Sequence, residues 1–196
     1  MQNDRIVELA INNGGYVLTS QIKEEGIPTI ELTRLVKNNK LERVSKGYYT
    51  LKNTFVDEYY IYQSKSKNSI YSFSTALYLH DLSDRTPLYY DISVPVGYNG
   101  SLLNDNNVKL HYVKKEVFEL GLTTIKSPFG IDIRVYDLER TMCDIIKYKD
   151  KIDIEIYSLA LKRYSANKNK DLNRLMKYAK ILKTDKKVRE YMEVLL

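Results

Sequence analysis

The sequence contains little of the residue types that build disulfides and metal sites. Cys143 is its single cysteine, which excludes an internal disulfide and a zinc site made of cysteine ligands. We expect Cys143 to be a small buried apolar residue in a protein of a reducing compartment. The two histidines, His80 and His111, are too few for a histidine-rich site. The sequence therefore predicts no metal and no cofactor, although carboxylate ligands stay open.

Long apolar runs and common catalytic motifs are also missing. No stretch of about 18 apolar residues occurs, and the N-terminus begins with Asp4, Arg5 and Glu8 in place of a basic stretch and an apolar segment. We expect a cytoplasmic protein that does not bind membranes. The sequence has no G-x-x-x-x-G-K-[ST], G-x-G-x-x-G or G-x-S-x-G motif. These absences argue against a phosphate-binding loop or a serine hydrolase, so no enzyme is predicted.

What the sequence does have is an uneven distribution of charge. Hydrophobic residues make up 43% of the chain and charged residues 29%, as in ordinary folded proteins. Residues 147–196 hold 14 of the 31 Lys and Arg residues but only 7 of the 25 Asp and Glu residues, whereas residues 53–146 are mildly acidic. Either a surface for a polyanion or the solvated exteriors of helices explains this basic region.

The first 52 residues are predicted to form three short helices. Apolar residues at helical spacing indicate a first helix that ends at the glycine pair 14–15. Thr19 can cap a second helix that ends at Gly26. Pro28 suits the first turn of a third helix, which has an apolar stripe along one side.

A basic hairpin is predicted to follow the third helix. Residues 41–44 and 48–51 are two short strands, and Lys46 lies at the tip between them. Three helices followed by a basic hairpin is the order of a winged helix-turn-helix, whose third helix reads the DNA groove. A purely structural three-helix unit is the alternative.

The DNA-binding candidates lie on the polar face of the third helix, on the hairpin and near the C-terminus. Thr29, Thr33 or Arg34 is expected to contact bases, because short polar and Arg side chains read base edges. Basic side chains elsewhere are expected to contact phosphates. These phosphate-binding candidates are Lys37, Arg43, Lys46, Lys177 and Lys180.

The rest of the chain predicts a linker helix and a second domain. Residues 53–68 form the linker helix and end in the polar stretch Gln63–Asn68, and residues 69–196 form a mixed domain. Within that domain a helix over 72–80 precedes three strands of a small sheet, over 91–95, 108–113 and 131–136. Pro95 closes the first of these strands or moves it to a sheet edge. The predicted fold class is α+β, with an N-terminal winged helix-turn-helix at 1–52.

Helices are predicted from residue 137 onward. Four aspartates stand where helix N-caps belong, namely Asp137, Asp153, Asp171 and Asp185. Asp185-Lys186-Lys187 matches half of a metal-nuclease site, but helix capping explains it better. His80 follows an apolar helix and is expected to have a structural role, as a helix C-terminal partner or in a buried hydrogen bond. The orientation of His111 stays open.

Three segments resemble AbiEi-type antitoxins. Leu41–Leu51 (LERVSKGYYTL) resembles their wing, Ser72–Pro87 resembles the block that opens their C-terminal domain, and Asp137–Asp144 (DLERTMCD) is also similar. The resemblance implies an antitoxin of a type IV toxin-antitoxin system, of the kind that serves phage defence by abortive infection. It further implies that the protein represses its own operon by binding inverted repeats. A nucleotidyltransferase toxin would be opposed without a stable complex.

Two inverted repeats require two protein molecules, so dimerisation or cooperative loading on the operator is expected. Two other functions stay open. One is a nuclease or nucleic-acid-modifying enzyme targeted by the same winged module. The other is a transcription factor that senses a small ligand through its tyrosine-rich C-terminal domain.

Overall fold

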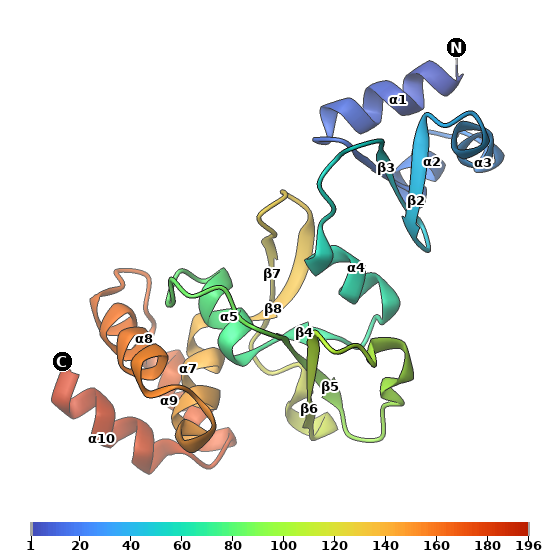
Figure 1. Ribbon diagram of the computed structural model, residues 1–196. Helices are drawn as coiled ribbons and strands as arrows, with labels where there is room; N and C mark the ends of the chain where they lie inside the picture. The colour runs from blue at the N-terminus through green and yellow to red at the C-terminus, as the bar shows by residue number, and fades with distance from the viewer. Residues whose placement is uncertain (1, 196) are drawn as a thin grey trace. The chain divides into compact units, whose positions relative to one another are not determined.

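The computed structural model describes residues 2–195 and divides the chain into two compact units (Figure 1). Unit 1 comprises residues 1–65 and 126–131, and unit 2 comprises residues 66–125 and 132–196. The hairpin tip at 126–131 therefore belongs to the N-terminal unit, although the strands on either side of it come from the C-terminal half of the chain. The predicted domain boundaries, at residues 52 and 69, describe segments expected to fold independently, and they stay a prediction.

Unit 1 contains the helices and strands expected of a winged helix-turn-helix. In chain order they are α1 (Gln2–Asn12), β1 (Tyr16–Leu18), α2 (Thr19–Glu24), α3 (Ile30–Lys37), β2 (Leu41–Ser45) and β3 (Tyr48–Leu51). The unit also contains α4 (Glu58–Lys65), which lies within the segment 53–68 predicted as a linker helix. The three strands form an antiparallel sheet of order β1-β3-β2. The sequence analysis found the three helices and the hairpin but not β1, because three residues are too short for a period-2 pattern to be recognised.

Two details of the helix starts differ from the prediction. Thr19 is the first residue of α2 and does not cap it. Instead, the backbone N–H of Leu18 donates to Oε1 of Gln21 at 2.9 Å, so a side chain inside the helix reaches back over its start. The third helix begins at Ile30, two residues after Pro28, which lies in the preceding turn.

The core of unit 1 joins its helices to its sheet. The buried residues of this cluster are Ile6, Ala10, Val17, Ile22, Ile27, Leu32, Leu35 and Leu41. They come from α1, β1, α2, α3, β2 and the turn before α3, so the apolar stripes of α1, α2 and α3 face one shared core. Unit 1 is further stabilised by the buried carboxylate of Asp57, which accepts hydrogen bonds from Ser127 Oγ at 2.5 Å and from Tyr60 N at 3.2 Å.

Unit 2 is a mixed sheet with a bundle of helices. Its strands are β4 (Ile70–Tyr71), β5 (Tyr90–Pro95), β6 (Val108–Val113), β7 (Leu122–Lys126, whose last residue is assigned to unit 1) and β8 (Asp132–Tyr136). The sheet order is β6-β5-β4-β8-β7; β5 and β6 pair in parallel, as do β4 and β8, and β4 and β5 are antiparallel. Pro95 closes β5 as predicted, and β4 and β7 are additional to the three predicted strands.

The helices of unit 2 pack mainly around α7. They are α5 (Phe73–Leu79), α6 (Lys115–Phe118), α7 (Leu138–Lys147), α8 (Ile154–Ala166), α9 (Leu172–Ile181) and α10 (Asp185–Leu195), with 3-10 turns η1 (Gly100–Leu103) and η2 (Lys149–Lys151). Figure 1 shows α7 to α10 gathered in one group. Cys143 is fully buried in their core, which confirms its predicted apolar role.

Three of the four predicted N-caps are confirmed. The carboxylates of Asp137, Asp153 and Asp171 accept hydrogen bonds from backbone N–H groups in the first turns of α7, α8 and α9. The prediction for Asp185 is wrong, because α10 begins at this residue. The backbone carbonyl oxygen of the preceding residue, Thr184, accepts the hydrogen bond from the backbone N–H of Val188. Together the two units confirm the α+β fold class. Within residues 2–195, the apolar helical segments are too short to cross a bilayer.

Candidate nucleic-acid interface

The two faces of α3 have opposite environments. Leu32 and Leu35 are almost completely buried in the core of unit 1, which fixes the rotation of the helix about its own axis. Thr33, Arg34 and Lys37 are all exposed on the opposite side. Because the buried face determines which side chains point outward, the helix presents a short polar surface in a defined orientation.

Arg34 is held in place by a partner that the sequence analysis missed. Its Nη1 lies 2.5 Å from Oε1 of Glu31, whose side chain is 9% exposed, whereas Arg34 itself is 61% exposed. The i, i+3 spacing of the two residues could have revealed the pair. Because the guanidinium lies mostly in solvent, the pair orients it without preventing Arg34 from contacting another group.

Thr29 lies at the N-cap position of α3 but does not cap it. Its backbone is helical, with φ −64° and ψ −16°, and its side chain makes no capping hydrogen bond. The exposed hydroxyl is therefore available at the start of the helix. Lys37 lies at the opposite end, in the last turn.

The hairpin of β2 and β3 carries the other basic candidates of unit 1. Arg43 is exposed on β2 opposite Tyr49, and the register shifts by one residue between Arg43 and Ser45. Lys46 is exposed in the turn, and Gly47 follows it with a φ of +81°, a left-handed conformation that glycine adopts at little cost. The tip therefore projects a lysine from a tight, glycine-dependent turn.

The turn end of the hairpin, next to Lys46 and Gly47, is anchored by an aromatic cluster. The Tyr48 ring is buried, lies 5.8 Å from the Tyr16 ring and 5.2 Å from the Tyr60 ring, and its hydroxyl accepts a hydrogen bond from Asp57 N at 3.3 Å. Burial raises the pKa of Tyr48, and it also raises the pKa of Asp57 despite the hydrogen bond from Ser127. The buried tyrosine is thus a structural support for the wing.

The eight DNA-binding candidates fall into two groups. Thr29, Thr33, Arg34, Lys37, Arg43 and Lys46 all lie on α3 and the hairpin of unit 1, where α3 packs against β2. Lys177 and Lys180 are exposed on α9 of unit 2. The structure thus places the first six on neighbouring elements, and the last two on a separate unit.

The two histidines have different surroundings. Nε2 of His80 lies 2.7 Å from the carbonyl oxygen of Tyr136, and burial lowers the pKa of His80, so its neutral imidazole donates to that carbonyl. This confirms the structural role predicted for His80. Nε2 of His111 lies 2.6 Å from Oδ1 of the buried Asp91 and its ring stacks on Phe73, which answers the open question of its orientation. Among the described residues, no group of three or more His, Cys, Asp or Glu side chains is placed to hold a metal ion.

Comparison with known proteins identifies the N-terminal module. Residues 4–52 match the family described as "Transcriptional regulator, AbiEi antitoxin", which confirms the resemblance to AbiEi antitoxins over this stretch. No curated protein gives a significant sequence match.

The comparison with solved structures gives a match over most of the chain. It is the crystal structure of the RV2827C protein from Mycobacterium tuberculosis, with a TM-score of 0.56 and 14% sequence identity. The match covers 91% of this chain and 71% of that chain. At this identity the similarity concerns the fold alone, which extends beyond the winged module into unit 2.

Proposed function

We propose that this protein is a transcriptional regulator that binds inverted repeats at its own promoter and is the antitoxin of a type IV toxin-antitoxin pair. The observation that carries the DNA-binding part is the exposed polar face of α3, next to a wing with a basic tip, in the stretch that matches AbiEi regulators. Two repeats would be bound by two copies of the chain, through dimerisation or cooperative loading.

The side chains divide by their expected roles. Thr29, Thr33 and Arg34 lie on the helix that enters the major groove in this class of module, where Arg reads guanine and short polar groups read several bases. Lys37, Arg43 and Lys46 are flexible cations at the margin of that helix and on the wing, and they suit phosphates. Specificity would therefore come from α3 and general affinity from the wing.

Arg34→Ala tests the base-reading role, and the chain offers a closely matched control. Arg5 is 63% exposed and pairs with Glu25 at 2.5 Å, much as Arg34 is 61% exposed and pairs with Glu31 at 2.5 Å. Arg5 lies on α1, and its partner Glu25 is 40% exposed whereas Glu31 is 9% exposed, so the folded state of both variants is checked first. We expect Arg34→Ala to lose about 1–3 kcal/mol of binding free energy at the operator, and Arg5→Ala to lose little. Fluorescence anisotropy with a DNA fragment from upstream of the operon measures both.

Lys46→Ala should behave differently. It removes a phosphate contact, so we expect weaker binding to operator and unrelated DNA alike, with a smaller dependence on salt. If a folded protein carrying Arg34→Ala and Lys46→Ala together binds the operator as tightly as the wild type, α3 and the wing are not the DNA-binding surface.

The antitoxin function is proposed to reside in the rest of the chain and to be separable from repression. The nucleotidyltransferase toxin would be opposed without a stable complex, as in type IV systems. We expect the Arg34→Ala/Lys46→Ala variant to fail to repress a reporter under the operon's own promoter but still to rescue growth of cells that express the cognate toxin. Loss of rescue by a folded, normally expressed variant would show that the two functions share one surface.

A further inference from the structure

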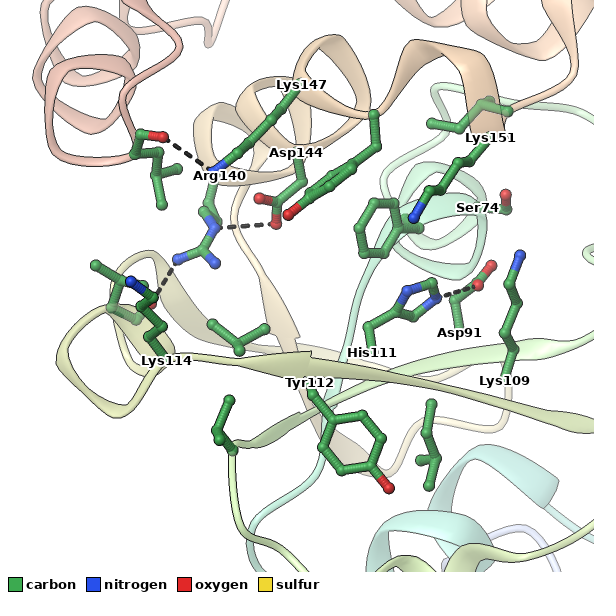
Figure 2. Close-up of a pocket in the computed structure, with 18 residues that line it drawn as sticks. Ser74, Asp91, Lys109, His111, Tyr112, Lys114, Arg140, Asp144, Lys147 and Lys151 are labelled. Atoms are coloured by element: carbon green, nitrogen blue, oxygen red, sulfur yellow. Dashed lines mark hydrogen bonds and ion pairs between the residues drawn. The ribbon is translucent and has the colours of Figure 1, made fainter.

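Unit 2 contains a cavity of about 520 Å³ between the strands β5 and β6 and the helix α7 (Figure 2). This volume is in the usual range for pockets that bind small organic ligands. Figure 2 shows Lys109 and Lys151 extending from different elements toward the paired side chains of His111 and Asp91. The cavity belongs entirely to unit 2, and neither the DNA-binding residues of α3 nor the wing contribute to it.

The charges in this cavity are only partly neutralised. Arg140 has a structural role and is not available to a ligand, because its Nε donates to Asp144 Oδ2 at 3.0 Å and its Nη1 donates to two backbone carbonyls. Lys147 donates to the carbonyl of Leu182 at 3.0 Å. Among the described residues, no acidic side chain forms an ion pair with the three remaining lysines, which are Lys109, Lys114 and Lys151. Since unpaired ammonium groups around one cavity repel each other, this arrangement suits an anion.

Aromatic rings form another part of the lining. The Phe73 ring is stacked on His111 at 4.1 Å and lies 5.8 Å from the Tyr148 ring, and Nζ of Lys151 lies 5.3 Å from the centre of the Tyr148 ring. Phe73 has a φ of +46°, which costs a residue with a side chain roughly 1–2 kcal/mol. Conformations of this kind persist where the surroundings hold them, and they concentrate at ligand sites. Phe73 is 8% exposed and Tyr148 is 38% exposed, so the cavity offers the Tyr148 ring as an open aromatic surface beside its cations, and Phe73 packs against that ring.

A second basic cavity, of about 640 Å³, shares Lys147 and Tyr148 with the first. Its other cationic lining residues are Lys180, Lys183, Lys186 and Lys187, and Asp185 is its single acidic one. Thr184 also lines it, is 4% exposed, and has a buried Oγ1 that finds no hydrogen-bond partner among the described residues. This hydroxyl lies directly before the N-terminus of the 11-residue helix α10, a position where anions bind well. A buried hydroxyl without a partner costs free energy that a bound ligand can recover.

We propose that the two cavities form one site for a nucleotide unit that carries several phosphates. The base would lie against the ring of Tyr148. The phosphates would contact the lysines that line the first and the second cavity, and Thr184 would donate a hydrogen bond to them. Two sources present this chemistry, a free nucleoside triphosphate and the end of a single nucleic-acid strand. The proposal does not depend on DNA binding by unit 1, although Lys180 is shared with the DNA-binding candidates.

Calorimetric titration of the full-length protein tests the site. The probes are ATP, CTP, GTP and UTP, each titrated separately, and a single-stranded RNA tetranucleotide with a 5′-phosphate. Lys109→Glu/Lys151→Glu places two negative charges in the first cavity, and we expect it to weaken binding at least tenfold. Lys162→Glu/Lys168→Glu makes the same charge change at exposed residues of unit 2 outside both cavities, and it should bind as the wild type does.

Two further variants separate ligand contacts from structural roles. Tyr148→Ala should weaken binding about tenfold, whereas Tyr148→Phe, which keeps the ring, should not. Thr184→Val removes the unpaired hydroxyl while keeping its shape, so we expect an unchanged or higher Tm together with roughly tenfold weaker binding. A lower Tm with unchanged affinity would show that Thr184 serves the fold alone.

The outcomes identify the source of the ligand. Binding of a triphosphate supports a free nucleotide, and binding of the RNA alone supports a strand end, in both cases with the same pattern among the variants. No binding of any probe at millimolar concentration, or binding that the folded Lys109→Glu/Lys151→Glu variant retains, overturns the proposal. Promoter binding, measured in parallel on the same variants, should match the wild type; its absence in the wild type would count against the DNA-binding function and not against this site.

Discussion

Unit 1 and unit 2 differ in how they bury charged side chains: unit 1 buries Asp57 and Glu31 singly, whereas unit 2 buries a cluster of them. In unit 1 the side chains proposed to act lie outside an apolar core, on one helix and one hairpin. In unit 2 charged groups go inside: Glu139 and Arg140 are 2% exposed and Asp144 is 5% exposed. Exposed functional side chains can all lie on one helix or hairpin, whereas buried charged side chains need hydrogen-bond or ion-pair partners from segments far apart in the sequence.

The largest expected effect is the loss of a buried charge partner in unit 2. Arg140→Ala would leave the carboxylate of Asp144 buried without its cation and would free the carbonyls of Val117 and Leu120. Removing one partner of a buried ion pair typically costs about 3–5 kcal/mol. We expect a loss of this size in the free energy of unfolding, measured by urea titration with far-UV circular dichroism.

Arg163→Ala is the matched control for Arg140→Ala. Arg163 also belongs to unit 2 and pairs with Asp84 at 2.5 Å, but Asp84 is 74% exposed. Pairs of this kind contribute about 0–1 kcal/mol. Equal losses for the two variants would contradict the contrast between buried and exposed charges.

Two glycines provide the next largest effect and compare the units directly. Gly14 in unit 1 and Gly121 in unit 2 have similar φ angles, +81° and +77°. A Cβ at Gly14 would meet nothing within 4 Å, whereas at Gly121 it would lie 2.4 Å from Cβ of Arg140. Alanine should therefore cost only the left-handed backbone penalty of about 1–2 kcal/mol at Gly14, and roughly 1–3 kcal/mol more at Gly121 because of overpacking. Thermal unfolding of both variants checks the difference, and equal Tm values would refute it.

The same contrast explains what the sequence could predict. The three helices and the hairpin of unit 1 were predicted because their apolar spacing and glycine stops are local signals, and the polar face of α3 follows from the same pattern. The pairing of Asp91 with His111 joins two strands 20 residues apart, and the lysines of the two cavities come from segments between residues 109 and 187. No local sequence pattern indicates that these residues are neighbours, so the two cavities could not be predicted from the sequence.

A smaller effect tests whether unit 2 takes part in DNA binding at all. If Lys177 and Lys180 each contact one phosphate, changing both to Gln should reduce the slope of log K against log salt concentration by about 1.8, because each neutralised phosphate contributes about 0.9. Anisotropy measurements over a range of salt concentrations give this slope. Lys162→Gln/Lys168→Gln is the control, and an unchanged slope for Lys177→Gln/Lys180→Gln would leave these two lysines as a solvated helix face.

The smallest expected effect is a difference between the units in their response to mild acid. Both histidines lie in unit 2, and burial lowers the pKa of His80 against the opposing influence of its hydrogen bond and of the nearby carboxylates of Asp137, Glu139 and Asp81. As the pH falls below about 6.5, the unfolded chain binds a proton that the folded His80 resists, so the stability that this group contributes is lost. The raised pKa values of Asp57 in unit 1 and of Asp137 and Asp144 in unit 2 act in the opposite direction, because the folded form gains from protonation as the pH falls. His80 is thus the group that sets unit 2 apart.

We therefore expect acid to weaken unit 2 before unit 1, and His80→Gln tests the origin of that weakness. Glutamine keeps a group that donates to the carbonyl of Tyr136 but does not titrate in this range. The fall in Tm between pH 7.5 and pH 5.5 should be smaller in His80→Gln than in the wild type, and each protein is compared with its own Tm at pH 7.5. Hydrogen exchange of backbone amides separates the units, since protection in α7 and α9 should decrease on acidification while protection in α1 and α3 persists. An identical fall in Tm for both proteins would show that His80 is not the group that makes unit 2 sensitive to acid.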